Sequence, residues 1–237
     1  MTWKRHTLVD ISDAGRKAIL AEVAGRGPTA AAMRGRLEAV ILPDAAGVRV
    51  PGTVRREDDY VPPGCVPVGF SDLFPNGGER LRVPAFARIE DILSVTSPYE
   101  AAALSLPARS SVMEALAAAR GRAASIGVPL GVWGSAAIEL YTGLPCTRAG
   151  SDLDLLVGPA PLEALSAFMG GMRALEKAFH LRIDVEVDLP CGYGVQLREL
   201  LGGGRTLLGK GLTQVALLPR ADVLAGLPGS GRAAADP

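Results

Sequence analysis

The sequence contains few of the residues on which thiol, histidine or zinc chemistry depends. Of its 237 residues, three are cysteines (Cys65, Cys146 and Cys191) and two are histidines (His6 and His180). The cysteines are widely spaced and form no CxxC pair, which argues against a disulfide framework and against a zinc knuckle. Acid, base or metal chemistry must therefore come mainly from carboxylates.

The chain also lacks an excess of charge and a long apolar run. Lys plus Arg and Asp plus Glu number 25 each, so no overall basic field favours a long nucleic acid. Hydrophobic residues make up 48% of the chain. Charged residues, Gly or Pro interrupt them every few positions, so no segment reaches the roughly 20 residues that span a bilayer. With no signal-peptide core at the start, we expect a soluble cytoplasmic protein that binds neither membrane nor long nucleic acid.

The character of the chain changes near residue 95. Before it, short β-like segments such as "CVPVGF" and "RLRVPAFARI" alternate with turns rich in Pro and Gly, and the run "AVIL" at 39–42 also reads as a strand. After it, helix start signals predominate, beginning with the capping box of Ser97 and Glu100. We predict an α+β protein with three parts: a small β-rich N-terminal domain (1–94), a catalytic domain with a mixed sheet flanked by helices (95–226) and a flexible tail (227–237).

Two aspartates stand one residue apart in the apolar stretch "SDLDLLV". We place Asp152 and Asp154 on one face of a strand, with α-carbons roughly 6.5 Å apart. Like charges this close repel each other, and burying them is costly unless metal ions supply the missing charge. Two Mg²⁺ ions would suit such a pair, as in in-line displacement at phosphorus. The alternative is a solvated edge strand on which both aspartates simply face water.

A second acidic strand is predicted about 30 residues further on, at "LRIDVEVDL". Its residues alternate strictly, so the charged ones share one face and the aliphatic ones take the other. A metal cage of this kind usually has a third carboxylate, and three candidates lie on the charged face: Asp184, Glu186 and Asp188.

A Gly-Ser pair precedes the first acidic strand. Gly134 would let a phosphate approach the backbone, and Ser135 adds a hydroxyl and an N–H at the start of a short helix that ends at Gly143. Taken alone, this pair is a common helix start. The acidic strand downstream is what makes it a candidate phosphate site.

Two cations are further candidates for phosphate contact. Arg148 lies in the loop before the first acidic strand, and Lys210 lies near the end of the chain; an ordinary surface role is the alternative for each. The segment around Lys210, residues 204–211, matches GxxxxGK but has Gly where a P-loop has Ser or Thr, so we interpret it as a loop. For His6 and Trp133 we expect structural roles.

The order of Gly-Ser, helix, Asp-x-Asp and later acidic strand resembles the nucleotidyltransferase fold of the polymerase β type. The stretch "GSAAIELYTGLPCTRAGSDLDLL" is similar to the catalytic stretch of the malonate decarboxylase holo-acyl-carrier-protein synthases, the phosphoribosyl-dephospho-CoA transferases. In that family a Ser, a "TGL" and an "SDLDLL" occur in this arrangement. The segments "RHTLVDI", "VPVGF", "RIDVEV" and "LLGKG" agree more loosely.

This resemblance implies a nucleotidyltransferase-like catalytic domain. It implies transfer of 2'-(5''-triphosphoribosyl)-3'-dephospho-CoA to a serine of an apo acyl carrier protein, with release of diphosphate. By the same resemblance, Asp152 and Asp154 hold Mg²⁺ and the Gly-Ser pair holds the leaving phosphates. Asp184 or Glu186 completes the cage and helps to deprotonate the carrier serine.

Two other functions remain open at this point. One is nucleotidyl transfer from ATP or another NTP to a protein or small-molecule acceptor, and the other is a non-catalytic module that binds a carrier protein. The N-terminal domain could meet substrate phosphates or an acidic carrier protein through a group of arginines. These arginines are Arg55, Arg56, Arg80 and Arg82.

Overall fold

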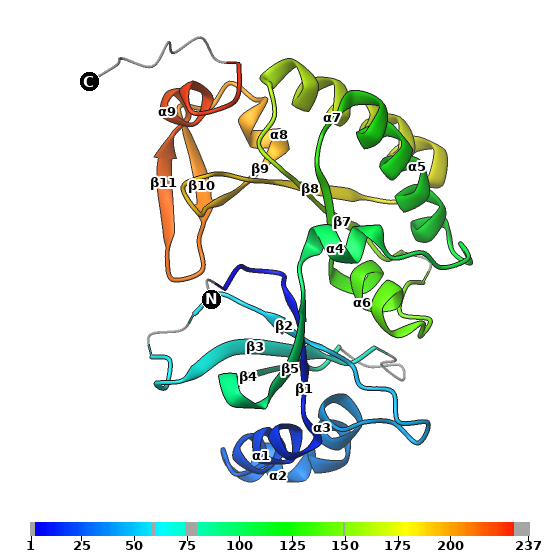
Figure 1. Ribbon diagram of the computed structural model, residues 1–237, viewed down its shortest axis with the longest axis vertical. Helices are drawn as coiled ribbons and strands as arrows, with labels where there is room; N and C mark the ends of the chain where they lie inside the picture. Colours follow the sequence, from blue (N-terminus) through cyan, green and yellow to red (C-terminus); the bar gives the residue numbers. More distant parts are fainter. Residues whose placement is uncertain (1–2, 58–59, 74–79, 149, 230–237) are drawn as a thin grey trace.

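The computed structural model describes residues 3–57, 60–73, 80–148 and 150–229. The chain forms two β-sheets, one above the other in Figure 1. The first has the order β4-β3-β2-β1-β5 and is antiparallel, and the second has the order β11-β10-β9-β8-β7-β6 and is mixed. The predicted α+β class, with a β-rich N-terminal part and a helix-flanked mixed sheet, is confirmed.

The elements follow one another along the whole described chain. The strands are β1 (Leu8–Ile11), β2 (Gly52–Val54), β3 (Cys65–Ser71), β4 (Arg82–Arg88), β5 (Ile92–Thr96), β6 (Leu130–Trp133), β7 (Leu153–Val157), β8 (Ile183–Asp188), β9 (Gly194–Gln196), β10 (Thr206–Lys210) and β11 (Val215–Pro219). The helices are α1 (Asp13–Ala24), α2 (Pro28–Ala32), α3 (Arg34–Ile41), α4 (Pro98–Ala103), α5 (Ser111–Ile126), α6 (Gly134–Thr142), α7 (Leu162–Phe179), α8 (Leu197–Leu200) and α9 (Arg220–Ala225).

Helices α1 and α3 pack on one face of the first sheet, and the short α2 lies against α1 (Figure 1). The predicted strand at 39–42 is wrong, because residues 39–41 form the end of α3. Leu37, Val40 and Ile41 are buried at helical spacing in this core, which a short apolar run cannot distinguish from a strand. Arg16 of α1 is fully buried and donates to the carbonyl oxygens of Ile11 and Ile41, so it ties α1 to the end of β1 and to α3.

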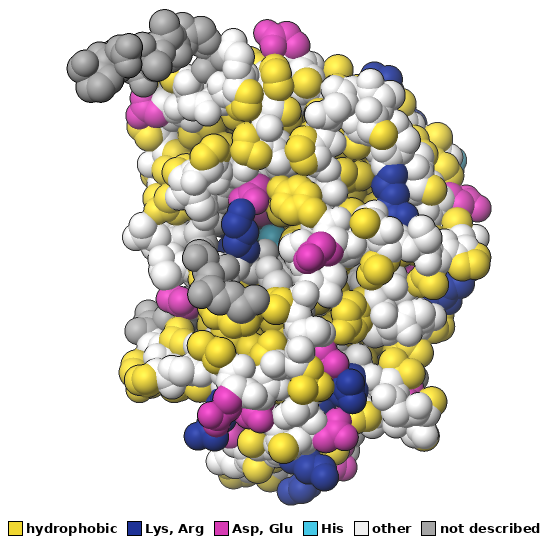
Figure 2. Space-filling model, in the orientation of Figure 1, with side chains coloured by type: hydrophobic (Ala, Val, Ile, Leu, Met, Phe, Trp, Pro, Cys, Tyr) yellow, Lys and Arg dark blue, Asp and Glu magenta, His cyan; other side chains and the backbone are white. Residues whose placement is uncertain are grey.

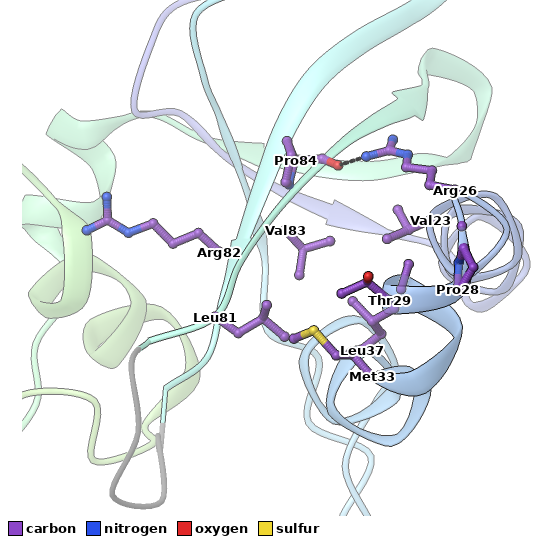
Figure 3. A pocket seen from close by; sticks show the side chains of 12 residues that line it. Val23, Arg26, Pro28, Thr29, Met33, Leu37, Leu81, Arg82, Val83 and Pro84 are labelled. Atoms are coloured by element: carbon purple, nitrogen blue, oxygen red, sulfur yellow. Dashed lines mark hydrogen bonds between the residues drawn. The ribbon is translucent and has the colours of Figure 1, made fainter.

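The first sheet is protected at its outer edge, strand β4. A mostly apolar cavity of about 400 Å³ lies between α1, α2 and this strand (Figure 3). Pro84 has no N–H to offer at the edge, and its carbonyl oxygen accepts from Arg26 at 2.7 Å. These two features block further strand pairing at this position.

Helices α5 and α7 cover the upper face of the second sheet in Figure 1. Leu153, Leu155, Ile183 and Val185 point into this core, which also contains Phe168 of α7. Because side chains alternate along a strand, the intervening residues of β7 and β8 face the other way, toward the N-terminal half. The acidic face of the second sheet is therefore turned toward the N-terminal segment of the chain.

The segment 204–211 is not the loop that its glycines suggest. Residues Thr206–Lys210 form β10, which pairs with β11 over five residues and meets β9 at Gly194. A strand ending at Lys210 is incompatible with a P-loop, whose phosphate-binding glycines lead into a helix. Of the predicted tail, Leu227 is buried in the second core, and residues 230–237 lie outside the described residues. No helix in the described part of the chain is long and apolar enough to cross a membrane.

Candidate active site

The two acidic strands lie side by side and bring their aspartates together. β7 and β8 are parallel neighbours, and Asp154 is in register with Asp184. Asp152 is exposed and precedes β7, which begins at Leu153, so the prediction that both aspartates of the pair lie within the strand is wrong. The first aspartate of the motif therefore lies at the mouth of the site, and the second lies within the sheet.

Asp154 carries the clearest electrostatic sign of a functional site. Burial and, in decreasing order, the negative charges of Asp184, Asp152 and Glu186 together raise the pKa of its carboxyl group to about 7. Arg182 opposes this only weakly, as the last of the contributions. A carboxylate at this position therefore lacks compensating positive charge, and a bound cation would supply it.

Gly134 makes room for the Asp154 carboxylate. It begins α6, has a φ of 68°, and lies directly after Trp133, which pairs with Asp154 across β6 and β7. A Cβ at Gly134 would overlap Oδ2 of Asp154. Glycine is needed here both for the left-handed backbone and for the close approach. Ser135 is the second residue of the same helix, as predicted.

Glu186 is held by three groups from distant parts of the chain. It is 2% exposed, and its Oε1 lies 2.9 Å from Lys210 Nζ. Its Oε2 lies 3.4 Å from Nη1 of Arg5 and 3.4 Å from Nε2 of His6. Burial alone would raise the pKa of Glu186, but the His6 hydrogen bond, the Arg5 charge and the Lys210 hydrogen bond lower it to about 2. A carboxylate this strongly held is a weak base.

The structure thus separates the two acids that the sequence left as alternatives. Asp184 faces Asp154, and its Oδ1 lies 3.0 Å from Nη2 of Arg182, the residue directly before β8. Glu186 is in register with Leu156 instead and is enclosed by Arg5, His6 and Lys210. Asp184 is the carboxylate better placed to act with Asp154.

Sequence reasoning missed the contribution of the N-terminal segment to this site. His6 stacks on Trp133, with ring centroids 4.0 Å apart, and it adopts an unusual φ of 68°. Burial lowers the pKa of His6 and so favours its neutral ring. The hydrogen bond to Glu186 acts in the opposite direction but is the smaller effect. Arg5 also donates to the carbonyl oxygen of Lys210 at 2.9 Å. No local spacing could reveal these contacts, because about 180 residues separate His6 from Glu186.

The two predicted phosphate contacts have different surroundings. Lys210 reaches the acidic face through its ion pair with Glu186 and is 32% exposed. Arg148 lies exposed in the loop before β7, where its backbone N–H donates to Ser151. Its charge contributes, after burial, to a lowered pKa of Arg80. The two arginines therefore lie close enough for their charges to interact, and Arg148 lies in the loop that leads to Asp152.

The carboxylate oxygens of Asp154 and Asp184 are donors that suit a hard cation, but they do not form a complete metal site by themselves. Within residues 3–57, 60–73, 80–148 and 150–229, no three His, Cys, Asp or Glu side chains are arranged to hold a metal ion. Mg²⁺, however, is commonly bound by one or two carboxylates together with substrate phosphates. The Asp154–Asp184 pair fits that mode of binding, because Arg182 pairs with Asp184 and leaves Asp154 without an ion-pair partner among the described residues.

A buried glutamate holds the loop that leads to Asp152. Glu139 of α6 is fully buried, and its Oε2 accepts from the backbone N–H of Thr147 at 2.7 Å and from the Thr147 hydroxyl at 2.8 Å. Its Oε1 lies 2.9 Å from Nη2 of Arg109. The Thr147 hydroxyl is also hydrogen-bonded to Ser110, which caps α5. The loop is therefore fastened to two helices.

Replacing Glu139 with Ala should destabilise the fold by about 2 kcal/mol, because it leaves the buried backbone N–H of Thr147 without its acceptor and removes the ion pair with the part-exposed Arg109. Chemical denaturation would measure this loss. The matched control is Glu38→Ala, which breaks an exposed pair with Arg34 and should cost about 0.5 kcal/mol or less. Equal effects of the two substitutions would contradict a structural role for Glu139.

Two family models and several related proteins match this chain, and all of them carry the same description. Residues 98–221 match the family described as phosphoribosyl-dephospho-CoA transferase MdcG C-terminal domain, and residues 4–98 match the corresponding N-terminal domain. A protein of Bradyrhizobium diazoefficiens named phosphoribosyl-dephospho-CoA transferase is 29% identical over 226 residues, which cover 95% of this chain and 94% of that protein. One of the same name from Xanthomonas campestris pv. campestris (strain 8004) is 34% identical over 176 residues, with 72% and 79% covered. No solved structure matches the chain.

Proposed function

Because the chain belongs to the phosphoribosyl-dephospho-CoA transferase family, we propose that it primes the apo acyl carrier protein of malonate decarboxylase. In this reaction a serine hydroxyl of the carrier attacks the α-phosphorus of the 5''-triphosphate of 2'-(5''-triphosphoribosyl)-3'-dephospho-CoA. A new P–O bond to serine forms, the bond to the β-phosphate oxygen breaks, and diphosphate leaves. The observation that carries the proposal is the buried carboxyl group of Asp154, with its raised pKa, facing Asp184 and lying beside Gly134 at the start of α6.

In this proposal Asp154 and Asp184 hold Mg²⁺, with Asp152 at the mouth of the site as a further ligand. When bound, the ion supplies positive charge that stabilises the phosphate oxygens during displacement. Asp184 is also placed to accept the serine proton. Glu186 is the poorer base of the two, because its three partners lower its pKa to about 2. Glu186 in turn positions Lys210 and Arg5 at the edge of the site.

The leaving diphosphate is assigned to the start of α6. The backbone N–H groups at Gly134 and Ser135 lie at the positive end of that helix dipole, which favours an anion. Arg148 is assigned to the same charge from the loop side, because it lies exposed before β7. These groups stabilise negative charge that develops as the P–O bond breaks.

The test is the intact mass of purified apo carrier protein after incubation with this protein, Mg²⁺ and the triphosphoribosyl donor. The expected gain equals the donor minus diphosphate, it disappears with EDTA, and a Ser→Ala carrier does not show it. A folded enzyme that leaves both donor and carrier unchanged would overturn the proposal. Modification of the carrier with ATP as the donor, in place of the dephospho-CoA compound, would overturn it in favour of general nucleotidyl transfer.

A further inference from the structure

A large cleft lies between the N-terminal segment and the second sheet. It has a volume of about 800 Å³, within the range of small-molecule sites in proteins. Figure 2 shows the molecule hollowed between its upper and lower halves, with acidic and basic side chains at the rim. The walls come from the segment before β1, the start of α4, the turn between β8 and β9, and the hairpin of β10 and β11.

The cleft lies directly beside the carboxylate pair Asp154 and Asp184. Leu156 and Glu186 line it, and they lie two residues beyond Asp154 and Asp184 on the same face of β7 and β8. Two residues of a strand span roughly 7 Å. A ligand in the cleft can therefore be one continuous molecule with a phosphate at the carboxylates.

The uncharged lining is suited to a flat ring and an aliphatic chain. Three aromatic residues, Trp3, Tyr99 and Tyr193, contribute to the walls, together with apolar side chains such as Leu212. Aromatic side chains bind planar rings through their faces and bury large apolar areas. Adenine and the pantetheine arm, which are the two large uncharged parts of dephospho-CoA and are joined through a ribose and a diphosphate, have this chemistry.

The charges along the cleft nearly cancel. The charged lining residues are three basic and three acidic: Lys4, Arg5, Lys210, Glu100, Glu186 and Asp188. Lys4 pairs with Asp188 at 3.0 Å, Lys210 pairs with Glu186 at 2.9 Å, and Glu100 accepts from the backbone N–H of Ser97. A cleft with nearly balanced charges gives no preference to a triphosphate, so it suits the other end of such a ligand, whose single diphosphate bridge is less charged and can meet the basic residues of the lining.

We propose that this cleft binds the dephospho-CoA part of the donor, while its triphosphate lies at the carboxylate pair. The assignment rests on the proposed function for the identity of the donor, and on the cleft itself for the place of binding. It also gives the N-terminal segment a role in recognition, because Trp3 and Arg5 form one wall of the cleft.

The experiment uses S-methyl dephospho-CoA, which lacks the triphosphate and whose own thiol is blocked. Cys191 lines the cleft and is exposed, whereas Cys65 lies on β3 outside it and Cys146 is buried. Saturating ligand should slow the alkylation of Cys191 by iodoacetamide about tenfold and leave the rate at Cys65 unchanged, as measured by peptide mass spectrometry. This readout uses the unmodified full chain, so it does not depend on the folding of a variant.

A second measurement tests the aromatic wall by calorimetry. Tyr193→Ala should weaken binding of the same ligand about tenfold, which corresponds to about 1.4 kcal/mol. The control Tyr60→Ala changes a tyrosine that is 68% exposed outside the cleft, and it should bind as the parent does. Asp154→Asn should also bind this ligand normally, because the ligand has no triphosphate to place at the carboxylates.

The outcomes separate the two proposals. Protection of Cys191 without carrier modification in the mass assay would keep the cleft assignment and remove the proposed function. Carrier modification with Cys191 unprotected, and with an unchanged KM in Tyr193→Ala, would remove the cleft assignment alone. Equal protection of Cys65 and Cys191 would indicate a general effect on the fold and would overturn the assignment as well.

Discussion

An Asp154→Asn protein is expected to lose transfer activity by on the order of a thousandfold and to unfold at a higher temperature than the parent protein at pH 8. The activity loss follows because asparagine cannot supply the negative oxygen that would hold a cation against the donor phosphates, a contribution of several kcal/mol to the barrier. The gain in stability follows from the half-buried position of Asp154 among other acids.

The direction of the pH effect follows from the raised pKa of Asp154. Its pKa is about 7 in the folded protein against an ordinary value of 3.8, so folding favours the protonated form. Ionisation of this carboxylate destabilises the fold. The destabilisation is close to zero below about pH 4, grows as the pH rises and reaches its full value above about pH 7. Asparagine removes this cost, which we place on the order of 2 kcal/mol at pH 8.

Thermal unfolding at pH 8 and pH 4, with and without Mg²⁺, would measure both effects. The increase in Tm should be about 5 °C at pH 8 and close to zero at pH 4. Mg²⁺ should raise the Tm of the parent protein more than that of the variant. The control Asp152→Asn changes an exposed residue and should shift the stability by about 0.5 kcal/mol or less. A destabilised Asp154→Asn protein at pH 8 would contradict the raised pKa.

Replacing Gly134 with Ala is expected to reduce kcat/KM by on the order of a hundredfold. The added Cβ would overlap Oδ2 of Asp154, so the carboxylate has to move, and a displacement of about 1 Å at a reacting centre has an effect of this size. The positive φ adds about 1 kcal/mol of backbone strain. Steady-state kinetics and chemical denaturation, measured on the same protein, would separate the two effects.

The other end of the same helix provides the matched control. Gly143 has a φ of 73°, and a Cβ there would meet no atom within 4 Å. Gly143→Ala should therefore show the strain, with a stability loss of about 1 kcal/mol, but should keep its kcat/KM. If both variants lose activity equally, the close approach of Gly134 to Asp154 is not what matters.

Local signals predicted most of the elements around the site. The capping box at Ser97 and Glu100 is present, α6 ends at Thr142 with Gly143 as its cap, and the alternating stretch at 183–188 forms β8. The failures occurred where the apolar pattern was short or ambiguous. Residues 39–41 belong to a helix whose buried face depends on the first sheet, and 206–210 form a strand whose partner, β11, lies further along the chain.

The sequence predicted the two acidic strands of the candidate site, but not the contacts that come from distant parts of the chain. The facing position of Asp154 and Asp184 follows from two acidic strands in one parallel pair, and each strand is visible in the sequence. The isolation of Glu186 from that pair could not be predicted. It depends on Arg5 and His6, which come from the opposite end of the chain and have no periodic relation to β8.

The contact between the N-terminal segment and Glu186 also sets the order in which the protein can be completed during synthesis. Residues 5 and 6 leave the ribosome about 180 residues ahead of their partner, which at the usual elongation rate is roughly 10 to 40 s earlier. The first sheet can form in that interval, because its last strand ends at Thr96. The cleft cannot, because the β10–β11 hairpin that forms one of its walls is among the last parts made. A nascent chain therefore folds its N-terminal sheet early and completes the cleft only near the end of translation.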